Sequence, residues 1–438
     1  MDIKRLILLG LSILIVACEP TSVSQEPSIF RSMPKKIDAT DLPDVLTMDR
    51  EEVLRSRFVR FDFKILESKL LSVEDPTTIE PIEINLFDDL AIRIRTDDVQ
   101  RREGGIYVWS GIPASEYYGV VSLSFNEHTI FGTIQADGTI YEITPVKDDI
   151  VMIAEINQAR YQEEGPPIIP PKKYEKDSSE GPDAAADHEI GHEELKVLVV
   201  LPLPSYRFIC RGSFPFVNIL AIIESAYENN LNKVFNAVIA TGIHATVEIE
   251  CHDYNPIGDD LTADLSWVRT DAGIATLRDN HDADLVSLIV PSADFCGRAY
   301  ENYPVTATDE EWAYSVVKGS CALGNYSFAH ELGHNIGMRH DRTGNNDFGS
   351  STCNYGHVYP LKFLFFNMNM RTVMAYGSSC NGCSRAGVYS TPTTISFGFI
   401  SIGPFGVACN VPASGGNYRR ANNRQQLITA EPVVSAFR

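Results

Sequence analysis

Three histidines and a glutamate in the C-terminal half of this 438-residue chain have the spacing of a hydrolytic metal site. Residues 329–341 read AHELGHNIGMRHD, so His330 and His334 stand four positions apart and Glu331 directly follows the first. On a helix the two imidazoles lie on one face, one turn apart, and can reach the same ion. The sequence therefore predicts a metal-binding helix at this point of the chain.

The rest of this motif supplies a third ligand and a base. Gly337 lies three residues after His334, where a helix can end in the left-handed turn that glycine adopts readily, and the reversed chain then returns His340 to the ion. Three nitrogen ligands leave a fourth position for water, which is typical of a catalytic zinc site. Zinc lowers the pKa of such a water to about 7, and Glu331 is predicted to take its proton. A helix with three incidental histidines is the alternative, and chance would give the six fixed positions with a frequency on the order of 10⁻⁵.

The extended motif resembles that of the metzincin metalloproteases, in which a methionine turn follows the zinc ligands. Residues 371–377, RTVMAYG, lie at a suitable distance downstream. The resemblance implies that Met374 forms an apolar floor under the metal. It also implies that Tyr376 lies near the zinc, where it ligates the resting metal and stabilises the oxyanion. A purely structural tyrosine is the alternative.

Further segments resemble the bacterial branch of the reprolysins (adamalysin-like metzincins). Asp341 directly after the third histidine, FCGRAY at 295–300 and YSVV at 314–317 carry this resemblance, which is strongest to the peptidyl-Asp metalloendopeptidases and covers residues 196–438. It implies an α/β (α+β) catalytic domain with a twisted mixed sheet and an active-site helix. The implied activity is zinc-dependent hydrolysis of peptide bonds in proteins or peptides, with the substrate extended along an edge strand.

The same resemblance suggests cleavage beside aspartate. A cation would then have to read the acidic side chain, and Arg371 and Lys318 are the candidates in the sequence. Ordinary surface charge is the favoured alternative for both residues, since no motif assigns either of them to an acid-binding site.

A second H-E-x-x-H pattern, at residues 188–192, is predicted not to be catalytic. Leu195 and Leu198 occupy the places where the long motif needs glycine and histidine. The pattern also stands between a Pro- and Gly-rich stretch and a buried strand, which leaves no room for a stable helix.

The chain is expected to be made as an inactive precursor, because proteases that it resembles are usually silenced by a pro-segment. Residues 19–195 contain no cysteine, which excludes a thiol ligand, and hold 36 acidic against 18 basic side chains. The hypothesis is that this acidic pro-domain lies over the catalytic domain as an intramolecular inhibitor. Its zinc ligand would come from Asp183, Asp187, His188 or His192, and a solvated acidic linker is the alternative.

The N-terminus is predicted to be an export signal. Two basic residues precede an apolar run, residues 6–16, that is too short to span a membrane comfortably. The run leads into Cys18 through small residues and resembles a bacterial lipobox, so residues 1–18 are interpreted as a lipoprotein signal with a lipidated Cys18. The expected location is the bacterial cell envelope, or outside the cell after linker cleavage. A cleaved signal with a coincidental cysteine is the alternative.

Composition divides the remaining chain into four parts. Residues 19–45 are rich in Pro, Ser and Thr and are predicted to be a tether. Short alternating segments predict a small β-rich pro-domain at 46–159. Residues 160–195 are interpreted as an exposed acidic Pro/Gly linker, the natural place for proteolytic cutting. In residues 196–438 apolar runs such as KVLVVL alternate with helical patterns, which predicts the α/β catalytic domain.

Cysteine usage and charge narrow the class of protein further. Eight of the nine cysteines follow residue 209, which predicts up to four disulfides in an exported domain, with the pairing left open. Cys380 and Cys383 could instead form half of a structural zinc site, but no second pair supports that reading. The net charge of −21 argues against nucleic acid as a partner.

Two other functions and one other metal fit parts of the same sequence. A surface-binding lipoprotein on a protease fold is the rival from another class, and the intact Glu331 argues against it. A metal-dependent amidase that acts on something other than protein is the rival among enzymes. An oxygen-rich loop could bind calcium, but an ordinary turn is favoured because the spacing matches no known calcium-binding loop. Its residues are Asp341, Asn345, Asn346 and Asp347.

Overall fold

The computed structural model describes most of the chain. The described ranges are 28–33, 50–114, 119–136, 138–171, 194–211, 219–257, 260–344, 352–363, 366–397, 400–402, 404–409 and 420–438. Cys18, most of the tether and the second H-E-x-x-H pattern lie outside these ranges. Within them, no helix combines the length and the apolar character needed to cross a membrane.

The N-terminal part of the described chain is a nine-stranded antiparallel sheet, ordered β1-β2-β9-β8-β7-β6-β5-β4-β3. Buried and exposed residues alternate along its strands, as in β4. The buried apolar side chains of one face pack against helix α1, Phe63–Leu70. This alternation is why the segment pairs as a sheet. The strands are β1 Phe30–Ser32, β2 Val53–Phe61, β3 Ile82–Phe87, β4 Leu90–Arg101, β5 Tyr107–Pro113, β6 Val120–Phe125, β7 Ile130–Ala136, β8 Thr139–Lys147 and β9 Ile150–Ile156.

A second, five-stranded sheet has the order β11-β10-β12-β14-β13. Its first four strands are parallel, and the edge strand β13 runs antiparallel to β14. The strands are β10 Glu194–Pro202, β11 His244–His252, β12 Leu285–Val290, β13 Gly297–Ala299 and β14 Tyr314–Lys318. The whole described chain is therefore a mixed α/β protein.

The central strand β10 explains why helices cover both faces of this sheet. Alternate residues of its apolar run enter two different cores: Val197 and Val199 face one, Leu198 and Val200 the other. Because side chains alternate across a strand, a continuous apolar run needs cover on both sides. Helices α3 and α7 supply one side, and α4 and α5 the other. Their bounds are α3 Ile219–Phe235, α4 Leu261–Thr270, α5 Ala272–Asn280 and α7 Ser327–Asn335.

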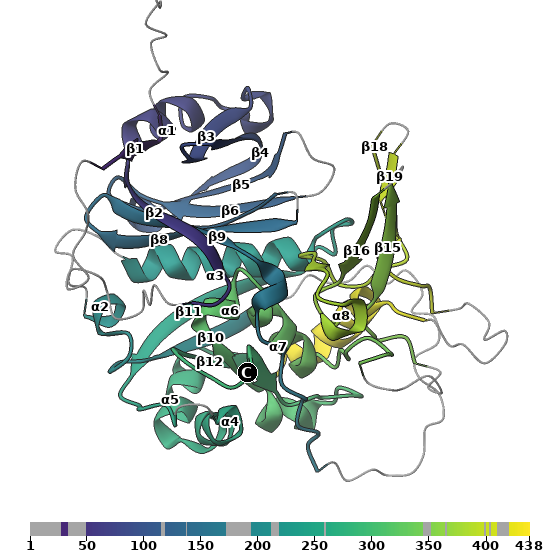
Figure 1. The fold of residues 1–438 in the computed structure, drawn as a ribbon. Coiled ribbons are helices and arrows are strands. Elements are labelled where there is room, and N and C mark those ends of the chain that lie inside the picture. Colours follow the sequence, from purple (N-terminus) through teal and green to yellow (C-terminus); the bar gives the residue numbers. More distant parts are fainter. Residues whose placement is uncertain are drawn as a thin grey trace, which may run out of the picture.

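Helix α3 lies between the two sheets, as Figure 1 shows. It contacts β11 on one side and β5, β6 and β7 on the other. Asn229 joins it to the N-terminal sheet, because it accepts a hydrogen bond from Ser110 Oγ (3.0 Å) and donates one to Ser122 Oγ (2.7 Å). The two sheets thus pack against one shared helix, and Asn229 of this helix is hydrogen-bonded to the N-terminal sheet.

The chain after α7 is mostly irregular and is stabilised by disulfides. Its regular elements are β15 Val358–Phe363, β16 Phe366–Arg371, β17 Ser384–Arg385, β18 Ile395–Phe397, β19 Ile400–Ile402 and α8 Asn423–Val434. Two further short helices lie before α7 in the sequence: α2 Arg207–Cys210 and α6 Gly319–Ala322. All eight cysteines after residue 209 are paired, which confirms the disulfide framework. The pairs are Cys210–Cys251, Cys296–Cys321, Cys353–Cys409 and Cys380–Cys383. Cys380 and Cys383 bond to each other and are not half of a zinc site.

Candidate active site

Helix α7 carries three of the predicted site residues, and every one of its residues is buried. Ile336 caps its end, and Gly337 follows with a positive φ of 86°. A β-carbon on Gly337 would come within 2.8 Å of the Asn302 carbonyl oxygen, so the chain can reverse here only at glycine. This turn returns the chain to the helix, as the spacing predicted.

The three histidines converge on one point. The Nε2 atom of His340 lies 3.0 Å from that of His330 and 2.9 Å from that of His334. All three ligand atoms lie within 4.8 Å of one another, and the side chains are fully buried. They form the only group of three or more potential metal ligands that the described residues contain.

Hydrogen bonds fix which nitrogen faces that point. His330 Nδ1 lies 2.8 Å from the Val373 carbonyl oxygen, and His334 Nδ1 lies 2.9 Å from the Met338 carbonyl oxygen. A carbonyl oxygen can only accept, so both Nδ1 atoms carry the proton and both Nε2 atoms present a lone pair. Backbone acceptors behind the ring are the usual support of metal-binding histidines.

The surroundings of the cluster keep its three imidazoles neutral. Burial lowers the pKa of His330 and of His340 well below the ordinary value, and repulsion from neighbouring cationic groups adds to it. Burial likewise lowers the pKa of His334 to about 4. The three rings are therefore neutral near pH 7, and His330 and His334 turn the lone pairs of their Nε2 atoms toward His340 Nε2. A metal ion fits this donor set, and nitrogen donors of this kind are those of zinc.

Glu331 follows His330 on α7, and its side chain is shielded from solvent. Neither carboxylate oxygen has a hydrogen-bond partner among the described residues, and the side chain is fully buried. It packs against β13, where a β-carbon on Gly297 would come within 2.5 Å of Glu331 Oε1. Burial, and after it the charge of Glu164, raise the pKa of Glu331 well above its ordinary value.

Met374 lies beneath the helix. Its sulfur is 2.6 Å from the place that a β-carbon on Gly333 would take, between the two histidines of the helix. Val373, the residue before it, accepts the hydrogen bond from His330. The methionine segment, residues 371–377, and the helix therefore hold each other in place.

Tyr376 and Asp341 join the methionine segment to the third histidine. The ring of Tyr376 lies against that of His340, with 3.9 Å between centroids. The amide of Tyr376 donates to Asp341 Oδ1 (2.9 Å), and the amide of Gly344 donates to Asp341 Oδ2 (3.0 Å). Both oxygens of Asp341 thus hold backbone in place, as expected for a turn. Asn345, Asn346 and Asp347 lie outside the described residues.

A segment of the linker lies along the edge strand β13. Gly165 N donates to Gly297 O (2.8 Å), Cys296 N to Glu163 O (3.0 Å) and Ile168 N to Ala299 O (2.9 Å). The segment runs parallel to β13. Because Gly297 touches Glu331 on its other side, residues 163–168 lie next to the histidine cluster. Asp183, Asp187, His188 and His192, which the sequence offered as latency ligands, lie outside the described residues.

The two cations considered as readers of an acidic substrate have other partners. Arg371 is buried, not at the surface, and donates to the carbonyl oxygens of Ala375 (2.7 Å) and Cys383 (3.2 Å). Burial, followed by repulsion from Arg385, lowers the pKa of Arg371 to about 9. Lys318 donates to the side chain of Gln162 (3.1 Å).

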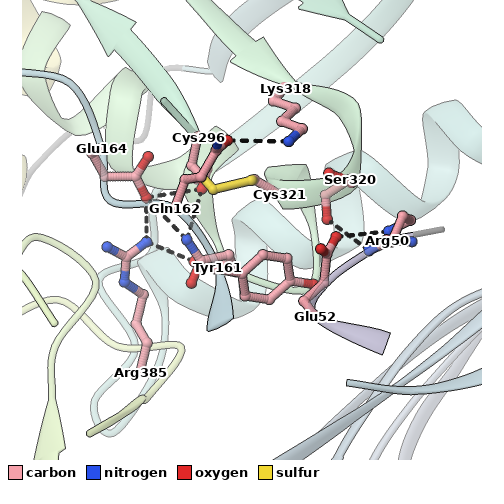
Figure 2. Close-up of a disulfide and its surroundings, with 12 residues drawn as sticks. Arg50, Glu52, Tyr161, Gln162, Glu164, Cys296, Lys318, Ser320, Cys321 and Arg385 are labelled. Carbon is pink, nitrogen blue, oxygen red and sulfur yellow. Dashed lines mark hydrogen bonds and ion pairs between the residues drawn. A yellow bond between two sulfur atoms is a disulfide. The ribbon is translucent and has the colours of Figure 1, made fainter. Parts of the chain in front are cut away.

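Arg385 was missed by the sequence reasoning. Its guanidinium forms a fully buried ion pair with Glu164 of the linker, 2.6 Å long. Figure 2 shows this pair beside the Cys296–Cys321 disulfide, with Gln162 and Lys318 close by. The signal available in the sequence was the acidic pair Glu163-Glu164 before Gly165-Pro166-Pro167.

Comparison with known proteins agrees with this geometry. Residues 217–385 match the reprolysin model of metallo-peptidase family M12. A peptidyl-Asp metalloendopeptidase of Xanthomonas campestris is 26% identical over 377 residues, 82% of this chain and 82% of that protein. One from Stenotrophomonas maltophilia is 27% identical, over 71% of this chain and 69% of its own length. One from Pseudomonas fragi is 32% identical over 118 residues, 27% of this chain and 62% of that protein.

Fold, donor set and family match together define the class of protein. Residues 217–385 are a reprolysin-like metallopeptidase domain of family M12, and over most of its length the chain is similar to bacterial peptidyl-Asp metalloendopeptidases. It is a zinc metalloendopeptidase, and the three-histidine cluster is the site in the described residues that suits the zinc of this family.

Proposed function

We propose that this chain is the exported, latent precursor of a zinc metalloendopeptidase in which His330, His334 and His340 hold the metal and Glu331 is the general base. The observation that carries the proposal is the convergence of three buried histidine Nε2 atoms beside a buried carboxylate that has no hydrogen-bond partner among the described residues. Zinc bound there supplies a Lewis acid that polarises the scissile carbonyl and acidifies water.

The residues of the chain have separate tasks in this reaction. Glu331 takes a proton from the attacking water at its carboxylate and passes it to the nitrogen of the leaving amine. Tyr376, against His340, donates a hydrogen bond from its hydroxyl to the substrate carbonyl oxygen as that oxygen gains negative charge. The carbonyl oxygens of Val373 and Met338 keep the rings of His330 and His334 from turning, and Met374 packs against Gly333 between them, so that the ligand set is formed before substrate arrives.

Edge strand β13 offers the binding surface for an extended substrate. The backbone groups of Cys296, Gly297 and Ala299 pair with the linker in this structure, and a substrate chain would use the same groups once the linker leaves. The names of the relatives support cleavage beside aspartate.

The N-terminal half directs the enzyme to the cell envelope and keeps it inactive. Residues 46–159 form the pro-domain, and residues 160–195 the linker whose cutting releases the catalytic domain, residues 196–438. Residues 1–18 are the lipoprotein signal, residues 19–45 the tether, and lipidated Cys18 anchors the precursor to a membrane of the cell envelope. The lipobox pattern supports the anchor, and the linker on β13 supports latency.

The test is zinc content and cleavage of denatured casein by the full chain, before and after limiting trypsin, beside Glu331→Gln. Trypsin has sites in the linker at Lys172, Lys173 and Lys176. One zinc in both forms, with cleavage by the cut wild type alone, is expected. Zinc without any cleavage would favour a binding protein on a protease fold, and well-folded chain without zinc would contradict the ligand set.

A further inference from the structure

The carboxylate of Glu164 lies in a set of donors that is built for an acid. Its Oε1 atom accepts from Arg385 Nη1 (2.6 Å), Ser327 Oγ (2.8 Å) and Asn325 Nδ2 (3.2 Å). The side chains of Glu164 and Arg385 are both completely inaccessible to solvent. Ser327 is also the first residue of α7, so the carboxylate lies at the positive end of the helix dipole.

This acid-binding site, formed by Arg385, Asn325 and Ser327, adjoins the place of reaction. Ser327 stands one turn before His330 on the same helix. The residue after Glu164 is Gly165, which bonds to Gly297, and Gly297 touches the Glu331 carboxylate. A chain on β13 therefore places one side chain in the acid-binding site while its backbone passes the general base.

Arg385 has a partner in the catalytic domain besides Glu164. Its Nη1 also donates to the Asn325 carbonyl oxygen (2.7 Å). In the precursor the pro-domain holds its backbone as well, because its amide donates to Gln158 Oε1 (3.0 Å) and its carbonyl oxygen accepts from Gln135 Nε2 (2.8 Å). Nε and Nη2 are buried and have no partner within the described residues, so the guanidinium retains donors for a carboxylate that meets it through two oxygens.

Stability alone does not account for such a pair. Two charges removed from water gain little over apolar side chains of similar volume, because desolvation offsets their attraction. Glu164 also belongs to the segment whose cutting is proposed to activate the enzyme. Once it leaves, the guanidinium would be buried without a counter-charge, a state that an acidic ligand relieves.

We propose that Arg385, with Asn325 and Ser327, is the specificity site that binds an acidic side chain of the substrate next to the scissile bond, and that Glu164 occupies this site in the precursor as an internal substrate mimic. The inference rests on the proposed function. Latency then comes from an acidic residue of the linker, and no zinc ligand from residues 183–192 is needed for it. An amide in the site would leave the charge of Arg385 uncompensated, which is the physical basis for choosing Asp or Glu over Asn or Gln.

The experiment compares zinc-loaded full chains that differ at the linker. Glu164→Gln removes the charge of the mimic. Gly165→Val disrupts the packing of the linker on β13, because even a β-carbon at this position comes within 3.0 Å of Gly297 O. Glu194→Gln, at an exposed residue of β10, controls for the loss of one charge. The substrates are two fluorogenic peptides that are identical except that the single acidic residue of one, an Asp, is Asn in the other.

We expect wild type and Glu194→Gln to be slow, and both linker variants to cleave the Asp peptide at least about tenfold faster. We expect the Asn peptide to be at least about tenfold poorer. In the Gly165→Val background, Arg385→Lys should lower kcat/KM for the Asp peptide about 10- to 100-fold and move the Asp/Asn ratio toward one, because an ammonium cannot reproduce the fork of donors. Ser327→Ala should lower the same ratio by less, and it serves if Arg385→Lys does not fold.

Each contrary result identifies what has failed. Equal cleavage of both peptides by Gly165→Val, or a ratio that neither Arg385→Lys nor Ser327→Ala moves, would overturn the specificity site and leave the protease intact. Linker variants no faster than wild type would overturn the role of Glu164. If no zinc-loaded form, including trypsin-cut wild type, cleaves either peptide or denatured casein, the proposed function itself is wrong.

Discussion

The sulfur of Met374 lies 2.6 Å from the position that a β-carbon on Gly333 would occupy. Gly333 stands on α7 between His330 and His334, so the closeness of methionine and helix is possible only because the residue between the two ligands has no side chain. The helix and the methionine segment are thereby fixed relative to each other before any metal binds.

Gly333→Ala is therefore expected to lower zinc affinity by at least about tenfold and the free energy of unfolding by about 1–3 kcal/mol, the usual cost of an overfilled core. Zinc retained after dialysis against graded chelator, and thermal melts, measure both. Adding Met374→Ala should restore part of the zinc affinity, since it removes the clash. A double variant no better than Gly333→Ala would show that the contact is not the cause.

Asp341 holds Tyr376 to the loop of the third histidine through the Tyr376 amide. Asp341→Ala should lower kcat about tenfold or more, because both the ring of Tyr376 and His340 lose their support. Tyr376→Phe keeps the ring and loses only the hydroxyl, so it should lower kcat with KM little changed. Steady-state kinetics on one peptide substrate, with linker-cut enzyme, separates the two. Full activity in Tyr376→Phe would leave the tyrosine a structural role only.

The local parts of this site were predictable from sequence. His330, Glu331 and His334 follow from helical periodicity, and Gly337 from the backbone turn that returns His340. These relationships span a dozen residues, so the spacing in the chain determines the geometry. Met374 is more distant, and a family resemblance was needed to place it.

The pair of Glu164 and Arg385 could not be predicted in this way. Their side chains meet across 221 positions of sequence, and only the packing of the linker, helix α7 and strand β17 brings them together. Arg371 shows the same limit, since an arginine that looked like a surface charge is buried by the loop it supports. The disulfide pairs and the order of the nine-stranded sheet likewise depend on contacts that no local pattern specifies.

A pH dependence of stability should arise at His357. Burial, opposed in part by the charge of Asp341, lowers its pKa from 6.5 to about 4. Between these values the unfolded chain binds a proton that the folded chain excludes, so the free energy of unfolding falls as the pH is lowered from 6.5 toward 4. His357→Gln should reduce this fall by about 1–3 kcal/mol. Denaturant melts at pH 7 and pH 4.5 measure it, with the exposed His244→Gln as control. An unchanged slope in His357→Gln would assign the effect to other groups.

Gly297→Ala tests the contact between the edge strand and the general base. The new methyl group would come within 2.5 Å of Glu331 Oε1, and the pairing of Gly297 with β14 resists a shift of the strand, so the carboxylate must move. Because proton transfer depends on placement to within about an ångström, kcat of the linker-cut enzyme should fall about 100-fold. Zinc content should stay at the wild-type level, since the three atoms nearest to the new methyl group all belong to Glu331 and none to a histidine. Glu331→Gln supplies the reference for complete loss of the base. Loss of zinc together with activity would mean that the strand positions the metal ligands, whereas wild-type kcat would mean that Glu331 does not act from the position it has here.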